Sequence, residues 1–149
     1  MSCISALVNM ICFSWSPRAL NSGRLNKALG SYDFIGGGSG NCADSSNATG
    51  SFVGGGGNNC AIGGANTVSG GYNNRATGTQ SFMGGGLSNI SSGQWSTNSG
   101  GYSTRSFGQG SSVGGGNQTI ACCSYSTVAG GALNTASSAY STEIGRAHV

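Results

Sequence analysis

The residues of this chain best suited to chemistry are its six cysteines. Cysteine thiolates bind zinc in sets of about four ligands, and the usual mark of such a site is a pair of cysteines separated by two residues. No such pair occurs here. Cys122 and Cys123 are adjacent, so in a strand their side chains would point to opposite faces. The sequence therefore predicts no zinc site, and we expect no other metal and no cofactor.

Residues for general acid–base catalysis are scarce as well. The chain has three Asp and Glu residues and one histidine, and its last seven residues contain both Glu143 and His148. Outside that segment the only carboxylates are those of Asp33 and Asp44, so general acid–base catalysis has few groups to use. The glycine clusters resemble phosphate-binding loops, but no Gly-Lys-Ser/Thr follows any of them. We expect no catalytic residue and no enzyme activity.

The composition excludes several other classes of protein. Charged residues make up 6% of the 149 positions, about a quarter of the usual share. The net charge of +3 comes from six scattered Lys and Arg residues, which argues against a nucleic-acid partner. No run of 18 apolar residues occurs, so this chain is not expected to insert into a membrane. A flexible glycine-rich linker and a repeat protein are the two classes that remain.

A fifteen-residue period decides between these two classes. Each glycine cluster is preceded by an anchor residue, and Leu20 is a degenerate first anchor. The other anchors are Ile35, Val53, Val68, Met83, Asn98, Val113 and Val128. Counted from Leu20, successive anchors are 15 residues apart, except for one interval of 18 between Ile35 and Val53. A linker has no reason to keep such a register, so the spacing indicates a repeat architecture.

Three further columns keep the same register. The third residue after each anchor is glycine: Gly23, Gly38, Gly56, Gly71, Gly86, Gly101, Gly116 and Gly131. The sixth is asparagine or threonine: Asn26, Asn41, Asn59, Asn74, Asn89, Thr104, Thr119 and Asn134. The eighth is small: Ala28, Ala43, Ala61, Ala76, Ser91, Ser106, Ala121 and Ala136.

The alternation of these positions has the period of strands rather than of helices. Glycines between the short strands allow the positive φ angles that sharp corners require. The sequence therefore predicts an all-β protein, a parallel β-solenoid of about eight coils over 20–142 that stack about 4.8 Å apart. The asparagine column would hydrogen-bond from coil to coil, which is a structural role rather than a catalytic one.

The repeat units resemble the head repeats of trimeric autotransporter adhesins. The stretches that carry the resemblance are 78–84 (GTQSFMG), 108–114 (GQGSSVG) and 56–63 (GGNNCAIG), and the likeness extends over about 20–142. It implies a left-handed β-roll, three chains around one axis, and an adhesive role at a bacterial surface. The repeat of 15 residues departs from the 14 residues usual in that family. Its triple glycines resemble those in fibre proteins of phages and other viruses.

A predicted interior of one Val-class residue and one alanine per coil is thin, which itself favours an oligomer. Phe34, Phe52 and Phe82 share the column before the anchor, and we expect their burial between chains. Trp95, Tyr125 and Tyr140 share a second column. They are our candidates for contact with a partner.

The interval of 18 places three extra residues within 42–52, where we expect a bulge or a longer turn. Cys42 and Cys60 both stand seven residues after their anchors, on consecutive coils. Stacked coils bring such positions within the Cα separation that a disulfide tolerates. The sequence leaves open whether these two cysteines are bonded or are free thiols.

The two ends do not follow the repeat. The N-terminal segment 1–19 is a capping segment, a docking segment or a non-native stretch. The C-terminal segment 143–149 (EIGRAHV) resembles the in-frame translation of a sequencing adapter, and Glu143 stands where the register calls for an apolar residue. We exclude both segments from the repeat.

The function expected from the sequence is structural and adhesive. It is that of a homotrimeric, extracellular repeat region that binds a host surface protein, matrix or glycan. A bacterial cell surface and a virion surface, as in a tail-fibre shaft, both remain open. An ice-binding solenoid is a further alternative, because one column carries Thr97, Ser112, Thr127 and Thr142.

Overall fold

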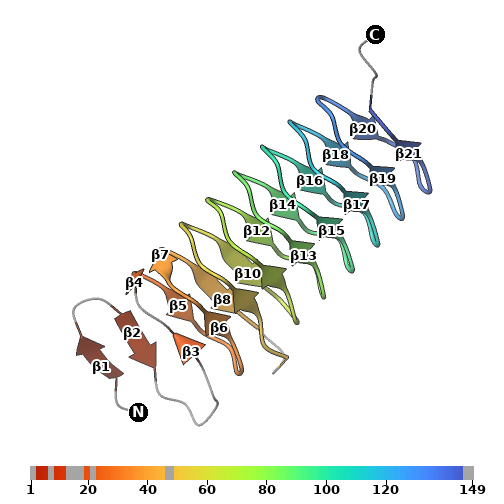
Figure 1. Ribbon diagram of the computed structural model, residues 1–149. Coiled ribbons are helices and arrows are strands. Elements are labelled where there is room, and N and C mark those ends of the chain that lie inside the picture. The colour runs from red at the N-terminus through yellow and green to blue at the C-terminus, as the bar shows by residue number, and fades with distance from the viewer. Residues whose placement is uncertain (1–2, 7–8, 13–18, 21–22, 46–48, 146–149) are drawn as a thin grey trace.

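The computed structural model describes residues 3–6, 9–12, 19–20, 23–45 and 49–145 of the chain. Within these residues every regular element is a strand and none is a helix. The strands stack into a rod of parallel coils (Figure 1). The predicted all-β parallel solenoid of about eight coils is therefore confirmed.

Each coil contributes one short strand to each of two long parallel sheets. The nine-stranded sheet contains β3 (Ala19–Leu20), β6 (Phe34–Ile35), β9 (Phe52–Val53), β11 (Thr67–Val68), β13 (Phe82–Met83), β15 (Thr97–Asn98), β17 (Ser112–Val113), β19 (Thr127–Val128) and β21 (Thr142–Glu143). The eight-stranded sheet contains β5 (Lys27–Ala28), β8 (Cys42–Asp44), β10 (Cys60–Ile62), β12 (Arg75–Ala76), β14 (Ile90–Ser91), β16 (Arg105–Ser106), β18 (Ile120–Ala121) and β20 (Thr135–Ala136).

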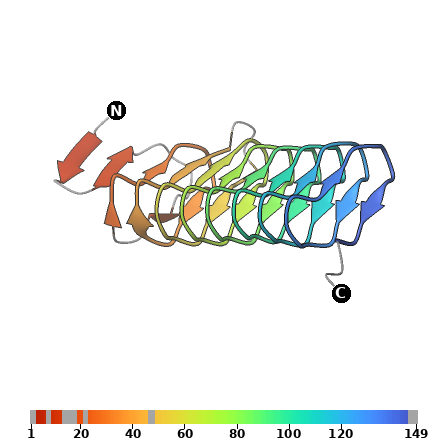
Figure 2. The ribbon, with the colours of Figure 1, turned by 90° about the horizontal axis from the view of Figure 1, so that it is seen from above.

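A third, narrower ladder closes each coil. It begins with β4 (Gly23–Arg24) and β7 (Gly38–Ser39), which pair in parallel. From Ser39 onward it continues as single bridges through the residue four after each anchor. Seen from above, the coils lie one beside the next along the whole length of the rod (Figure 2).

The strand register is the register of the sequence repeat. Val53 pairs with Val68, and Ala61 pairs with Ala76, so each column of the sequence becomes a row along the rod. Phe34 pairs with Phe52 across the interval of 18, which places the extra residues between β8 and β9. Residues 46–48 of that insertion lie outside the described residues.

Asp33 holds the two flanks of the insertion together. Its carboxylate is buried and accepts hydrogen bonds from three backbone N–H groups, those of Gly30 (2.6 Å), Ser45 (3.2 Å) and Ser51 (2.8 Å). Because Ser45 and Ser51 lie on either side of the extra residues, this carboxylate keeps the coils in register across them. One of the two aspartates considered for proton transfer is therefore engaged in a structural contact.

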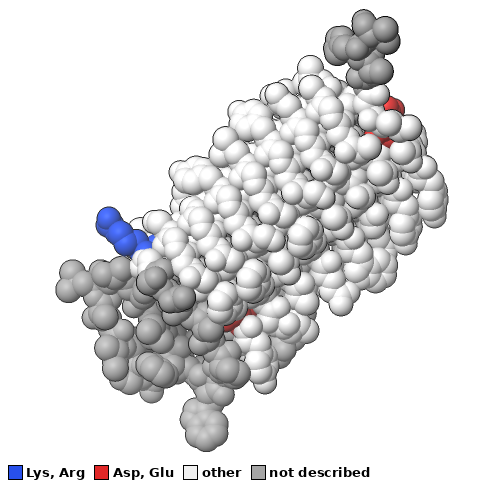
Figure 3. Space-filling view, viewed as in Figure 1, with Lys and Arg blue, Asp and Glu red and all other residues white. Residues whose placement is uncertain are grey.

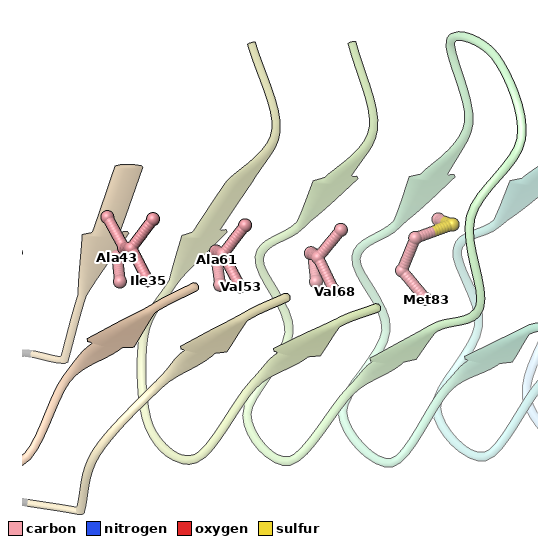
Figure 4. Close-up of a cluster of buried hydrophobic side chains, with 7 residues drawn as sticks. Ile35, Ala43, Val53, Ala61, Val68 and Met83 are labelled. Carbon is pink, nitrogen blue, oxygen red and sulfur yellow. The ribbon is translucent and has the colours of Figure 1, made fainter. Parts of the chain in front are cut away.

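The anchor and alanine columns meet between the two sheets and form the apolar core (Figure 4). The anchors Val53, Val68, Val113 and Val128 are fully buried. The core is divided into two clusters, one ending at Met83 and the other beginning at Val113. The anchor between them is Asn98, so the hydrophobic interior is interrupted at the middle of the rod.

The asparagine column forms a continuous hydrogen-bonded ladder through the first part of the rod. Asn74 is typical: its Oδ1 accepts the backbone N–H of Asn89 (3.0 Å), and its Nδ2 donates to the carbonyls of Gly70 (2.9 Å) and Gly86 (2.8 Å). Asn41 and Asn59 repeat this pattern. The amide thus satisfies backbone groups that a tight corner leaves without partners.

The asparagine ladder ends at Thr104, which makes only some of the hydrogen bonds that an asparagine makes in this column. Its backbone N–H donates to Oδ1 of Asn89 (2.8 Å), but a threonine hydroxyl does not reach the backbone of the next coil. Thr119 and Asn134 still bond to the glycine carbonyl four residues before them, at 3.0 and 2.7 Å.

The glycine column sits where no other residue fits. Gly71 has a φ of 88°, a conformation that L-residues rarely adopt. A Cβ at this position would overlap the carbonyl oxygen of Gly86 on the next coil. The same positive φ recurs at Gly38, Gly56, Gly86, Gly101, Gly116 and Gly131.

The two ends of the chain extend the rod by different means. The strands β1 (Cys3–Ala6) and β2 (Asn9–Cys12) form an antiparallel hairpin at the N-terminal end, with Cys3 and Cys12 opposite each other (Figure 1). At the other end the parallel pairing continues to Glu143, opposite Val128. Residues 146–149, which include His148, lie outside the described residues.

Candidate functional site

The two long sheets expose two faces of different chemistry. We call the outward row of the nine-stranded sheet the phenylalanine face. It consists of Phe34, Phe52, Thr67, Phe82, Thr97, Ser112, Thr127 and Thr142. We call the outward row of the eight-stranded sheet the arginine face. It consists of Lys27, Cys42, Cys60, Arg75, Ile90, Arg105, Ile120 and Thr135.

The phenylalanine face carries no charged side chain. The rings of Phe34 and Phe52 stack on consecutive coils, with centroids 5.1 Å apart and planes 5° from parallel. Phe52 and Phe82 are each 41% exposed, so large apolar rings project from a flat sheet. Beyond them the row contains only threonine and serine. Within one chain Phe34 is half-buried and Phe52 and Phe82 are exposed, so the expected burial of these rings between chains stays a prediction.

The arginine face holds three of the four basic side chains in the described residues. Lys27, Arg75 and Arg105 are all exposed and stand in one row, and the fourth, Arg24, lies in the third ladder. Few charged atoms appear on the side of the rod seen in Figure 3, where blue atoms gather only toward the N-terminal end. The cationic groups are therefore gathered on one outward face rather than spread over the rod.

A small hollow lies beside Arg105. It has a volume of about 170 Å³ and is lined by Ser103, Arg105, Gln118 and Ile120. Ser103 and Gln118 belong to the column five residues after the anchor, and they show that this polar column borders the arginine face. The lining of the hollow thus combines a guanidinium group, a hydroxyl group, an amide and an aliphatic side chain.

A row of large exposed side chains lies on the far side of this polar column. Tyr72, Leu87 and Tyr102 occupy consecutive bridges of the third ladder and are 55%, 41% and 49% exposed. The ring of Tyr72 lies over Gly57 of the preceding coil, and its hydroxyl accepts a hydrogen bond from Nδ2 of Asn58 (3.1 Å). Sequence reasoning missed this row, although a shared offset of four residues from the anchor could have revealed it.

The three aromatic residues proposed for partner contact lie at another corner of the coil. Trp95, Tyr125 and Tyr140 all have positive φ angles, between 56° and 60°, and all are exposed. Tyr125 and Tyr140 stack with centroids 5.3 Å apart. Trp95 stands apart from them because Gly110 occupies the coil between, and its Nε1 donates to Oε1 of Gln80 (2.7 Å). The structure thus brings two of the three together.

The thiols of Cys42 and Cys60 stand side by side on the arginine face and are not bonded to each other. A hydrogen bond from Cys42 and the nearby charge of Arg75 lower the pKa of Cys60 to about 7. The same hydrogen bond, together with burial, raises the pKa of Cys42. Cys60 is therefore the thiol of this pair that ionises first.

The expectation that Cys122 and Cys123 point apart is wrong. Their sulfur atoms lie 2.8 Å from each other, because β18 ends at Ala121 and the two residues follow it in a turn. Strand alternation does not apply there. This contact raises the pKa of Cys123. No group of three or more potential metal ligands gathers anywhere in the described residues.

Comparison of the sequence with protein-family models and with curated proteins finds no match to either. Among the described residues, no helix is long and apolar enough to cross a membrane.

Proposed function

We propose that this chain is a structural and adhesive repeat region of a fibre or adhesin head, displayed outside the cell on a bacterium or on a virion. It acts without catalysis and presents its side chains to a host surface protein, matrix or glycan. The observation that carries this proposal is the rod itself, which has two outward faces of contrasting chemistry and exposed rows of aromatic side chains. Regular rows of this kind suit repeated contact with an extended partner.

The phenylalanine face is the surface through which three copies associate. Burial of Phe52 and Phe82 against neighbouring chains would remove apolar area from water, which is the main driving force of association. No charged group on this face has to lose its hydration. The slender core of each coil also supports association, since few apolar atoms are buried within one chain.

The arginine face is unsuited to the same role. If copies met through it, the guanidinium groups of Arg75 and Arg105 would approach those of their neighbours, and like charges brought together in an apolar interface destabilise it. The trimer therefore leaves the arginine face open to solvent, where a ligand can reach it.

Adhesion is tested with the full chain coupled to fluorescent beads and applied to host-cell monolayers and to surfaces coated with extracellular matrix. We expect retention of the beads under flow, above that of beads coupled to albumin. Retention no greater than the albumin control on every surface would contradict the adhesive function.

A second candidate function rests on the C-terminal half of the phenylalanine face. Thr97, Ser112, Thr127 and Thr142 stand in register on neighbouring strands, a flat hydroxyl row of the kind that could order water. The rings of Phe52 and Phe82 interrupt this row toward the N-terminus. A thermal-hysteresis measurement on the full chain separates the two functions, and we expect no hysteresis.

A further inference from the structure

We propose that the arginine face binds a linear anionic polysaccharide that runs along the axis of the rod. Its acid groups, carboxylate or sulfate, rest on Arg75 and Arg105. This inference depends on the proposed adhesive function and assigns it a ligand class.

The first support is the absence of acidic residues around Arg75 and Arg105. Between Asp44 and Glu143 the sequence contains no Asp or Glu at all. The exposed guanidinium groups of Arg75 and Arg105 therefore have no carboxylate of their own coils to pair with. Arginine forms paired, parallel hydrogen bonds with carboxylate and sulfate-like groups. The face thus offers two guanidinium groups that can donate hydrogen bonds to an anion and that no carboxylate of the protein neutralises.

The second support is the spacing of these two residues. Ile90 separates them, so they stand two coils apart, at about 9.6 Å for strands stacked at the usual distance. Two pyranose rings joined by a glycosidic bond extend over about the same length. A polymer with one acid group per disaccharide can therefore place successive acid groups on both arginines without bending.

The third support is the chemistry of the two flanking columns. The polar column next to the arginines contains Asn73 and Ser88, which hydrogen-bond to each other at 3.1 Å, and it continues to Ser103 and Gln118 at the hollow. Amides and hydroxyls of this kind can bond sugar hydroxyl groups. Beyond them the exposed rings of Tyr72 and Tyr102 are again two coils apart. Aromatic faces of this kind can pack on the apolar C–H faces of sugar rings.

A nucleic acid is a poorer occupant of this surface. Affinity for nucleic acid grows with the number of phosphates that cations neutralise. Two arginines on one row would neutralise only a small number, and no cation follows Arg105 on the arginine face. Across this surface a row of cations is followed by a row of hydroxyls and amides and then by a row of aromatic rings, an arrangement that fits a sugar polymer better.

The test measures binding of the immobilised full-length chain to three polysaccharides and to single-stranded DNA by biolayer interferometry. Hyaluronan carries one carboxylate per disaccharide, κ-carrageenan carries one sulfate, and dextran is neutral. We expect binding to at least one of the two anionic polymers, weakened by added salt because the contacts are exposed, and none to dextran. Which polymer binds identifies the acid group. Failure of both anionic polymers to bind, or equal binding of single-stranded DNA, would overturn the proposal.

Two variants distinguish the effect of the spacing between the two arginines from the effect of their charge. Arg75→Gln/Arg105→Gln should weaken binding on the order of tenfold, as expected for two exposed charge pairs. The matched control, Ile90→Arg/Arg105→Ile, keeps the net charge but moves the two guanidinium groups onto neighbouring coils. Because this row already holds both residue types, the exchange should fold normally. We expect it to bind as poorly as the double glutamine variant, and affinity equal to that of the unaltered chain would refute the role of spacing.

The same proteins on beads distinguish failure of this inference from failure of adhesion. Retention on host cells or matrix, without binding to either anionic polymer, would leave the adhesive function intact and reject the polysaccharide ligand. If neither retention nor binding occurred, both proposals would fall together.

Discussion

The hydroxyl of Thr104 lies within hydrogen-bond distance of Oδ1 of Asn98 (2.9 Å), across the interior of one coil, and also of Oδ1 of Asn89 (2.8 Å). Both residues depart from the repeat, since Asn98 takes the place of an apolar anchor and Thr104 that of a ladder asparagine. The remaining groups of the Asn98 amide are also satisfied, by the carbonyl of Ile90 and the backbone N–H of Gly100, each at 3.2 Å. Two departures from the pattern thus make one buried polar contact that divides the apolar core.

Replacing Asn98 by valine should stabilise the rod. Valine occupies this column on other coils, and it would join the two apolar clusters while removing a buried amide. Thr104 retains the carbonyl of Gly100, 2.9 Å away, as an acceptor. We expect the free energy of unfolding in urea to rise by about 1–2 kcal/mol.

The reverse change, Val68→Asn, is the matched control. The ladder residue of that coil is Asn74, whose amide is already engaged, so the new side chain has no threonine hydroxyl to bond and only backbone groups within reach. A loss of about 1–3 kcal/mol is expected for the incompletely paired buried amide. If Asn98→Val instead lowered the free energy of unfolding, the Asn98–Thr104 contact would be a net source of stability.

The repeat in the sequence was sufficient to predict the strands, their register and the corners. Periodicity reports which residues face inward, because inward positions must be apolar or small in every coil. The pairing of Asn98 with Thr104 was not predictable, since each looks like an isolated deviation until the coil brings them together. The contact of Cys122 with Cys123 was missed because the strand ends one residue earlier than alternation assumes.

The candidate site was harder to predict for a related reason. Outward positions tolerate many residue types, so Tyr72, Arg75, Tyr102 and Arg105 leave no conserved column for a period search to detect. The stacked coils place these four residues in two parallel rows, which the sequence shows only as shared offsets of four and seven residues from the anchors. The site is therefore harder to predict from the sequence than the fold is.

The ladder predicts a large penalty for Asn74→Ala. This change removes one acceptor and two donors from buried backbone groups, each of which costs about 1–3 kcal/mol when left unpaired. We expect a loss of at least about 3 kcal/mol in urea unfolding. The control is Asn73→Gly, because Asn73 lies next in sequence with a φ of 57° and bonds only at the surface. Similar losses in both variants would contradict the ladder.

Adjacent glycines should respond very differently to the same substitution. Gly71→Ala forces a Cβ onto the Gly86 carbonyl at a positive φ, so we expect severe destabilisation or failure to fold. Gly70→Ala should change the melting temperature little, since the nearest atom to its added Cβ, the Gly55 carbonyl oxygen, is 3.8 Å away. Circular dichroism melts of the two variants provide the comparison, and tolerance of alanine at Gly71 would argue against these corners.

The thiol pair predicts a pH-dependent reactivity. With a pKa lowered to about 7, Cys60 should react with iodoacetamide at half its maximal rate near pH 7, whereas an ordinary thiol does so near pH 9. Removing the hydrogen bond by Cys42→Ala, or the positive charge by Arg75→Gln, should move the midpoint upward. Peptide mass spectrometry resolves Cys60 from the other cysteines. An unchanged midpoint in Cys42→Ala would exclude the hydrogen bond as the main cause.

The central claim is that this rod associates through its phenylalanine face and leaves its arginine face free. Sedimentation equilibrium of the full chain tests it most directly. We expect three times the 14.6 kDa chain mass for the unaltered protein and for Tyr72→Lys/Tyr102→Lys, and the mass of one chain for Phe52→Lys/Phe82→Lys. A folded monomer for the unaltered protein, or a trimer that survives lysine at both phenylalanines, would contradict this account.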